Sequence, residues 1–304
     1  MEIQKINFIN NIPVKNHHFY ELKDKNKYGF KLFMTSAFIG PPRSGKTLTA
    51  INLSKYLLDK NLISEIILIS PTYENNPFHV LNIPEENIIS ELDDIQNILL
   101  QVNEYCKSEV EKWKNLKKSM TEKQYNKFYK KIYKIYKCNE KNPEIILENE
   151  ELLLSDEDLD ILKNNKYQKK PFYYHNGPSF LIILDDINGT SIIADKKVNP
   201  LTQIISNHRH NHINLFILIQ NYSRGIQANI RRLIKQYFLF KFNDLKEVKQ
   251  FYDEIASAYF PNFELFKDVY RRVTNVEHNF LLTDNDAKDG NLRVRQNFNE
   301  LIKI

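Results

Sequence analysis

Short runs of isoleucine, leucine and phenylalanine recur along the chain, and segments that predict helices separate them. Runs that are apolar throughout are typical of strands buried on both faces of a sheet. Strands are predicted at Lys31–Ile39, Ser64–Ser70, Phe180–Asp186, Asn214–Gln220, Gln236–Phe242 and His278–Asp284. Helices are expected after the first of them, ending near Asp59, and after the fifth, ending near Tyr259. This alternation indicates an α/β fold with a mostly parallel sheet and helices on both faces.

One long segment interrupts the alternation. About a hundred residues separate the second and third predicted strands, far more than a crossover needs. Within them, Cys106–Lys141 carries about a dozen lysines and favours two helices that could form a hairpin. The next segment, Glu144–Asp160, has eight acidic residues and no basic one. We expect a single domain over 1–304 with a helical, solvated insertion at 73–170. The alternative is an arm that contacts DNA or a partner, since lysines neutralise phosphates and tyrosines stack on bases.

The clearest chemical motif lies between the first strand and its helix. The sequence GPPRSGKT at Gly40–Thr47 fits the pattern G-x-x-x-x-G-K-[ST] in its required strand–loop–helix context. Glycines let the backbone approach phosphate oxygens, and the helix N-terminus supplies positive potential. Lys46 can reach the β- and γ-phosphates, and the Thr47 hydroxyl can bind Mg²⁺. The predicted nucleotide-binding residues are Gly40, Pro41, Pro42, Arg43, Ser44, Gly45, Lys46, Thr47 and Leu48.

Two acids end the third predicted strand. Mg²⁺ prefers a hard carboxylate at the end of a neighbouring strand, and Asp185 is placed for that role. Asp186 is a candidate for orienting or deprotonating the attacking water, although many ATPases use the longer glutamate there. A turn or helix-capping role is the alternative for both aspartates.

Further candidates follow the acids. Gln220 ends the next strand, where an amide can sense the γ-phosphate or simply cap the strand. Arg209 is the favoured arginine finger, a guanidinium that stabilises charge in phosphoryl transfer from a neighbouring subunit, with Arg224 and Arg232 as alternatives. The histidines of HRHNH at 208–212 predict a structural or nucleic-acid contact more than a zinc site.

Composition narrows the class of protein. Hydrophobic residues make up 42% and charged residues 27%, which is ordinary for a soluble globular protein. No apolar run approaches the roughly 20 residues that span a bilayer, and no signal peptide is evident. Cys106 and Cys138 form neither a disulfide framework nor a zinc spacing, so a reducing compartment is expected. The net charge of +5 permits contact with nucleic acid. The absence of an N-K-x-D element argues against a Ras-like GTPase.

Four features together resemble the HerA–FtsK superfamily of P-loop motors, most closely the DNA-packaging ATPases of poxviruses, giant viruses and virophages. These features are GPPRSGKT, FLIILDD, the arginine before the fourth strand, and FILIQNYSRGIQANIRRLIKQYFLFKF. The resemblance implies a RecA/FtsK-like P-loop fold, a γ-phosphate sensor at Gln220 and a trans-acting finger at Arg209. Lys46 and Thr47 would hold ATP and Mg²⁺, with Asp185 and Asp186 as the metal-binding and water-activating acids.

The resemblance also implies a task. We expect an ATPase that assembles as a homo-oligomeric ring, a hexamer in most relatives, and threads double-stranded DNA through its channel. It would package a viral genome into a capsid, with capsid proteins as further partners, in the virion or a viral factory of the host cytoplasm. A related motor for DNA segregation or processing, or a nucleotide-dependent switch that does not translocate, are the alternatives.

Overall fold

A computed structural model describes residues 2–5, 32–60, 62–130, 177–187, 199–287, 293–298 and 300–303. The strands are β1 (Glu2–Lys5), β2 (Thr35–Ile39), β3 (Glu65–Ile69), β4 (Ile88–Ile89), β5 (Phe180–Asp185), β6 (Ile213–Ile219), β7 (Gln236–Phe240), β8 (Phe280–Asp284), β9 (Val294–Gln296) and β10 (Glu300–Lys303). The helices are α1 (Lys46–Asp59), α2 (Ile95–Lys118), α6 (Pro200–Asn207), α7 (Tyr222–Gly225), α8 (Ala228–Arg231), α9 (Leu245–Glu254) and α10 (Phe263–Thr274). Short 3₁₀ turns lie at η1 (Tyr73–Asn75), η2 (Pro77–Leu81), η3 (Glu85–Asn87) and η5 (Ala256–Ala258).

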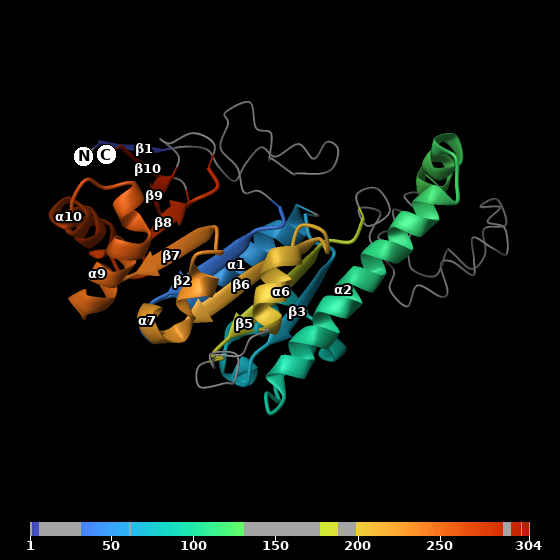
Figure 1. The fold of residues 1–304 in the computed structure, drawn as a ribbon, viewed down its shortest axis with the longest axis horizontal. Helices are drawn as coiled ribbons and strands as arrows, with labels where there is room; N and C mark the ends of the chain where they lie inside the picture. The colour runs from blue at the N-terminus through green and yellow to red at the C-terminus, as the bar shows by residue number, and fades with distance from the viewer. Residues whose placement is uncertain are drawn as a thin grey trace.

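All described strands join one sheet with the order β1-β10-β9-β8-β7-β2-β6-β5-β3-β4. The strands from β7 to β4 in this order run parallel to one another. The remaining strands continue the sheet in antiparallel fashion from β8 to β1. The two ends of the described chain therefore lie side by side at one edge of the sheet (Figure 1).

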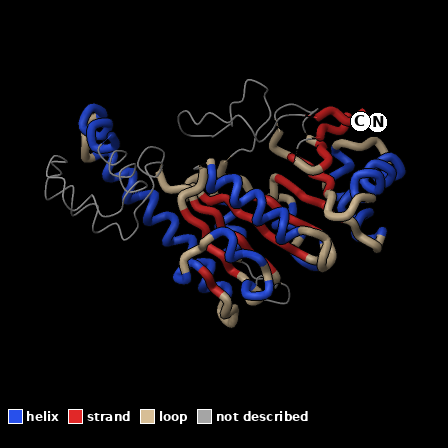
Figure 2. The backbone as a smooth tube through the Cα atoms, turned by 180° about the vertical axis from the view of Figure 1, so that it is seen from behind, coloured by secondary structure: helices blue, strands red, loops and turns tan. Residues whose placement is uncertain are grey.

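Both faces of the sheet are buried, which explains the uninterrupted apolar runs. Alternate strand residues face opposite sides, so that Ala37 and Ile39 lie in one core and Phe38 lies in the other. Helix α1 covers the second face, while α2, α6, α9 and α10 contribute to the first (Figures 1 and 2). The expected α/β fold, mostly parallel with helices on both faces, is confirmed.

The predicted elements match the structure with local corrections. Helix α1 ends at Asp59, as expected. The last predicted strand begins at Phe280 rather than His278, and it pairs antiparallel with β7. His278 has a left-handed φ of 65°, which a strand does not accommodate. The short strands β1, β4, β9 and β10 were not predicted, because so few residues carry too little periodicity.

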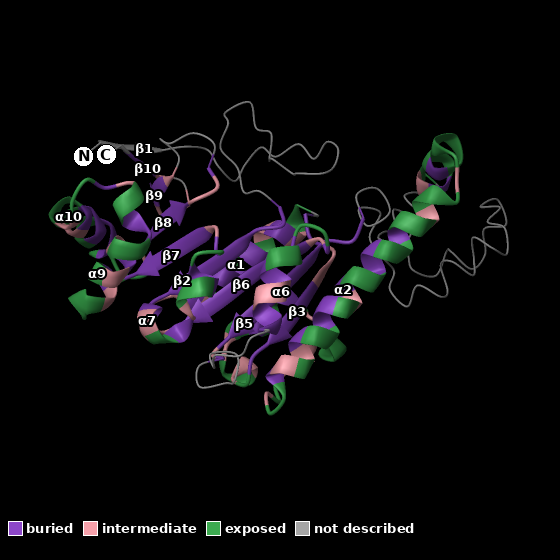
Figure 3. Ribbon diagram, in the orientation of Figure 1, coloured by how far each residue is buried: buried purple, intermediate pink, exposed green. Residues whose placement is uncertain are grey.

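The lysine-rich segment projects from the sheet. The first half of α2 packs on the core through residues such as Leu99 and Cys106, whereas its far end is mostly exposed (Figure 3). Residues 122–130 are also helical, and the Trp113 indole nitrogen donates a hydrogen bond to the Tyr125 hydroxyl oxygen at 3.1 Å. These two helical stretches agree with the predicted pair up to residue 130. Cys138, the acidic segment at 144–160 and the rest of the predicted insertion lie outside the described residues.

The projecting helices are basic at their far end. The lysines at positions 112, 114, 117, 118, 123, 127 and 130 are all exposed. This exposure is required by both roles predicted for the segment, a solvated insertion or an arm that binds a partner. In the part of the chain that the structure describes, none of the helices has the length and apolar character to cross a membrane.

Candidate functional site

The loop from Gly40 to Gly45 joins β2 to α1 and closes tightly on the sheet. The amide of Gly40 donates a hydrogen bond to the carbonyl oxygen of Ile219 on β6 at 3.2 Å. A Cβ atom at Gly40 would lie 2.6 Å from the Cβ of Phe240, so no larger residue fits there. Gly45 has a φ of 101°, which disfavours any residue with a Cβ. The two glycines of the motif are therefore required by this backbone path.

Lys46 is the first residue of α1, and only 8% of it is exposed. Its ammonium nitrogen lies across the loop and donates hydrogen bonds to the carbonyl oxygens of Gly40 at 2.6 Å and Pro41 at 2.8 Å. Burial lowers the pKa of Lys46 to about 8, although attraction to Asp185 and Asp186 opposes the change. The ammonium group is thus held inside the loop, beside the two acids.

Asp185 ends β5 at the same edge of the sheet as the loop, because β2, β6 and β5 are neighbours in register. Its carboxylate is 5% exposed and accepts hydrogen bonds from the Ser70 hydroxyl at 3.4 Å and the Asn76 amide at 3.3 Å. Burial, with repulsion from Asp186, raises the pKa of Asp185 to about 6. A carboxylate desolvated in this way would be stabilised by a bound cation.

Asp186 and Gln220 meet at the carboxyl ends of β5 and β6. The Gln220 amide nitrogen donates a hydrogen bond to an Asp186 carboxylate oxygen at 3.1 Å. Asp186 has a left-handed φ of 53°, a conformation that aspartate tolerates better than most residues, and the bend turns the chain away from β5. The Gln220 amide and the Asp186 carboxylate, which were predicted as separate candidates, therefore form one pair.

The residues present fit a magnesium-bound triphosphate. The buried Ser44 hydroxyl has no hydrogen-bond partner among the described residues, although it lies inside the phosphate loop. Thr47 is half-buried in the first turn of α1. With the loop amides, these hydroxyls and the acids supply the oxygen ligands and donors that Mg²⁺ and phosphate require. Ser70 and Asn76, which were not predicted as site residues, hydrogen-bond to the metal-binding candidate Asp185 and hold it in place.

Arg209 lies at the opposite end of the parallel strands, where β6 begins. It precedes β6, whose seven residues span roughly 20 Å before Gln220 is reached. Its guanidinium lies 3.3 Å from the carboxylate of Asp286, and both side chains are partly exposed. An arginine at this end cannot reach the phosphate loop of its own chain. The structure therefore does not bring Arg209 together with the other candidate catalytic residues.

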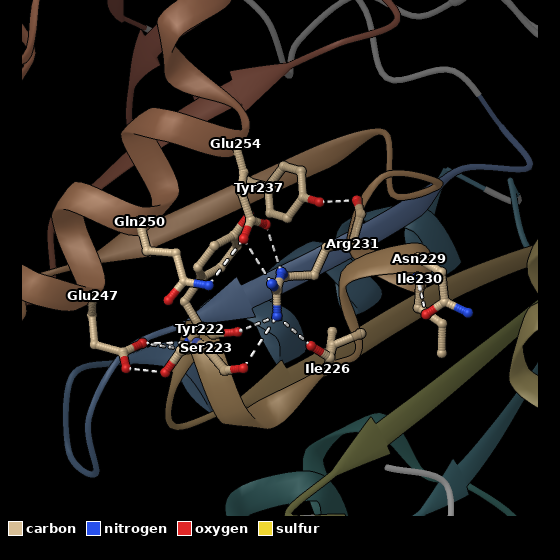
Figure 4. Close-up of polar contacts among 10 residues, drawn as sticks. All are labelled: Tyr222, Ser223, Ile226, Asn229, Ile230, Arg231, Tyr237, Glu247, Gln250 and Glu254. Carbon is tan, nitrogen blue, oxygen red and sulfur yellow. Dashed lines mark hydrogen bonds and ion pairs between the residues drawn. The ribbon is translucent and has the colours of Figure 1, made fainter. Parts of the chain in front are cut away.

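A buried network fixes the segment that follows Gln220 (Figure 4). The Arg231 guanidinium binds both carboxylate oxygens of Glu254 at 2.7 Å and donates to the carbonyl oxygen of Ile226 at 2.6 Å. It also lies 4.8 Å from the centre of the Tyr222 ring. The Glu247 carboxylate accepts from the backbone amide of Tyr222 at 2.6 Å. These contacts tie α7 and α8 to α9 and so set the position of the chain after β6.

Arg231 had no predicted role, although it lies in the segment FILIQNYSRGIQANIRRLIKQYFLFKF that carries the family resemblance. The one available signal was that Glu247 and Glu254 are seven residues apart and so share a face of α9. Arg224 and Arg232, the alternative fingers, are exposed.

The histidine run is divided between different surroundings. Nδ1 of His208 lies 2.5 Å from the carbonyl oxygen of Ile205, and Nδ1 of His212 lies 2.8 Å from that of Pro178. The His212 ring also stacks on Phe33. His210 is exposed. Within the described ranges, histidine, cysteine and acidic side chains form no cluster of three or more that could hold a metal.

Comparison with known proteins yields similarity in fold only. No protein-family model matches the chain, and no curated protein does. The genome packaging NTPase B204 from Sulfolobus turreted icosahedral virus 2, solved with ATP-gammaS, is 11% identical over 87% of this chain and 97% of its own, with a TM-score of 0.45. B204 from Sulfolobus turreted icosahedral virus, a DNA-packaging ATPase, is 11% identical over 88% and 97%, with a TM-score of 0.47. The cytoplasmic domain of the type VII secretion ATPase EccC from Thermomonospora curvata is 11% identical over 90% of this chain and 25% of its own, with a TM-score of 0.39. The chain is thus similar in fold to viral packaging NTPases and an EccC-type ATPase, and similarity at this level leaves the chemistry to be inferred from its own side chains.

Proposed function

We propose that the protein is an ATP-hydrolysing motor that moves double-stranded DNA into a viral capsid. The observation that carries the ATPase assignment is the meeting of Lys46, Asp185 and the Asp186–Gln220 pair at one edge of the sheet. No two of these elements are adjacent in sequence, apart from the two aspartates. A purely structural role would not require a buried ammonium and a desolvated carboxylate side by side.

Each residue has a distinct part in the proposed reaction. The loop amides and Lys46 would bind the β- and γ-phosphates, with the ammonium exchanging the carbonyls of Gly40 and Pro41 for phosphate oxygens. Thr47 and Asp185 would hold Mg²⁺, which when bound neutralises the charge on the phosphates. Asp186 would orient the attacking water and accept its proton, while Gln220 reports on the γ-phosphate through its hydrogen bond to Asp186.

The position of Arg209 supports assembly into a ring. An arginine that lies beyond the reach of its own phosphate loop can assist hydrolysis only in a second copy of the chain. Its pairing with Asp286 would hold the side chain at the surface until that copy docks. A homo-oligomeric ring, with a hexamer as the proposed size, satisfies this geometry because each subunit then completes the site of the next.

The packaging task rests on the resemblance in sequence, above all on the strand ending in Gln220 and the motif that follows it. Double-stranded DNA in the ring channel, contacts with capsid proteins, and a place in the virion or viral factory belong to the same proposal. A HerA/FtsK-like motor for segregation or processing is the alternative within the motor class. A nucleotide-dependent switch is the alternative outside it.

The first test is ATPase activity with and without double-stranded DNA, together with the mass of the nucleotide-bound assembly. A motor should show DNA-stimulated hydrolysis and a ring-sized mass. An ATPase rate that does not change when DNA is added would instead support the nucleotide-dependent switch. A virus whose genome encodes this chain beside a capsid protein would favour packaging over segregation.

A mixing experiment tests the trans-acting arginine. Arg209→Ala should abolish turnover while ATP affinity stays within about twofold, because the finger acts on transition-state charge. Subunits carrying Arg209→Ala should regain some activity when mixed with Asp185→Ala subunits, since some interfaces then hold both intact groups. If mixing restores nothing, or if ATP affinity falls as far as turnover does, the role of Arg209 is wrong.

A further inference from the structure

The phosphate loop has two unlike sides. In the sheet order, β6 and β5 with the acids lie on one side of β2, and β7 and β8 lie on the other. If the γ-phosphate faces Asp185 and Asp186, as the proposed function requires, the nucleoside end of ATP extends away from them. It then lies over the side where the α10–β8 connection reaches the edge of the sheet.

That connection places an imidazole ring against the phosphate loop. An added Cβ at Gly45 would lie 3.1 Å from Nδ1 of His278 and 3.4 Å from its Cγ. The two residues are 233 positions apart in sequence, and β8 brings them together because its amino end pairs with Phe240 at the carboxyl end of β7. A histidine ring therefore lies beside Gly45, the residue that caps the start of α1 in the phosphate loop.

Hydrogen bonds fix the backbone that carries this ring. His278 has a left-handed φ of 65°, and the Asn279 amide next to it donates to the carbonyl oxygen of Val276 at 3.2 Å. The Asn297 side chain binds Asn279 at 3.0 Å and Phe280 at 3.1 Å. The His278 side chain nevertheless remains 52% exposed, with the carboxylate of Glu277 at 3.7 Å from Nε2. A ring on a fixed backbone, with one side open, can pack against a ligand at a lower entropic cost than a ring on a loose segment.

Two apolar residues that are close in sequence to Gly45 and His278 are exposed. Leu48, three residues after Gly45, is 50% exposed, and Val276, two residues before His278, is 61% exposed. Large apolar residues exposed to this extent are few in the described part of the chain. A flat nitrogen heterocycle matches such a surface, because it stacks on aromatic rings and buries apolar area.

We propose that His278, with Leu48 and Val276, forms the wall that holds the nucleoside of the bound nucleotide, with the imidazole ring packed against the base. This inference rests on the proposed nucleotide site and adds a contact for the base and sugar. His278 is in this role a specificity residue that strengthens binding of nucleotides over bare polyphosphate. It takes no part in hydrolysis.

The test compares ADP with pyrophosphate, which shares its phosphates but lacks the nucleoside, by calorimetry in the presence of Mg²⁺. His278→Ala should weaken ADP binding roughly tenfold, about 1.4 kcal/mol, and leave pyrophosphate binding unchanged. His278→Phe should retain most of the ADP affinity, and His278→Gln should lose it as alanine does. His210→Ala, at an exposed histidine of the opposite edge, is the matched control and should alter neither.

Two results would refute the proposal that the His278 ring packs against the base. One is ADP affinity within twofold of the wild-type value in both His278→Ala and His278→Gln. The other is an equal loss for ADP and pyrophosphate, which would mean that the ring only shapes the phosphate loop. A wild-type protein that binds neither ligand would instead refute the nucleotide site itself, so the two failures are distinguishable.

Discussion

Replacing Asp185 by asparagine should make the nucleotide-free protein more stable while it removes ATP hydrolysis. The carboxylate is 5% exposed, lies beside Asp186, and is attracted by the neighbouring Lys46. The net result is a pKa of Asp185 raised from 3.8 to about 6. An asparagine side-chain oxygen can still accept the hydrogen bonds of Ser70 and Asn76, so the substitution removes the charge and keeps the contacts.

The magnitude follows from proton linkage. Because the folded-state pKa of Asp185 lies above the unfolded one, the folded protein binds more protons between the two values, and stability falls as pH rises through that window. The rise to about 6, at about 1.4 kcal/mol for each pKa unit, corresponds to about 3 kcal/mol lost above pH 6. Asp185→Asn should therefore raise the free energy of unfolding by about 3 kcal/mol near pH 7.5, by about half as much near pH 5, and by almost nothing below the unfolded-state pKa.

Urea unfolding followed by circular dichroism, at these pH values and without nucleotide, measures the effect. Asp93→Asn removes an exposed carboxylate before α2 and serves as the control, with an expected change within about 0.5 kcal/mol. Mg²⁺ with ADP should reduce the difference in unfolding free energy between Asp185→Asn and the wild type, because the cation would stabilise the wild-type carboxylate. An Asp185→Asn variant no more stable than the wild type near pH 7.5, or a gain that does not shrink on acidification, would refute the reasoning.

Two further substitutions test the rest of the site. Arg231→Met should lower the free energy of unfolding by about 3–5 kcal/mol, because it leaves the Glu254 carboxylate without its bidentate partner. Urea unfolding measures this loss, and Arg224→Met, at an exposed position, is the control. Gln220→Glu should lower the ATPase rate at least about a hundredfold and leave ATP affinity nearly unchanged, since it puts a second carboxylate 3.1 Å from Asp186. A variant that hydrolyses ATP at the wild-type rate would exclude Gln220 from the reaction.

Much of the nucleotide site was accessible from the sequence. The phosphate loop, the acid pair and Gln220 each follow an apolar run, and parallel strands bring their carboxyl ends to one edge. Local pattern is enough for such features, because the strand, the loop and the start of the helix are contiguous. The division into one domain with an insertion at 73–170 stays a prediction, as do the roles of the site residues.

The sequence by itself determined the longer strands of the sheet, β2, β3, β5, β6, β7 and β8, and the phosphate loop, the acid pair and Gln220 at their ends. Only the tertiary structure decided that Lys46 folds onto loop carbonyls, that Glu254 pairs with Arg231, and that His278 reaches Gly45. The physical reason is that apolar periodicity reports whether a residue faces the core, and it contains no information about partners far away in the chain. Strand order and the burial of charged groups determine those partners, and both exist only once the sheet has formed.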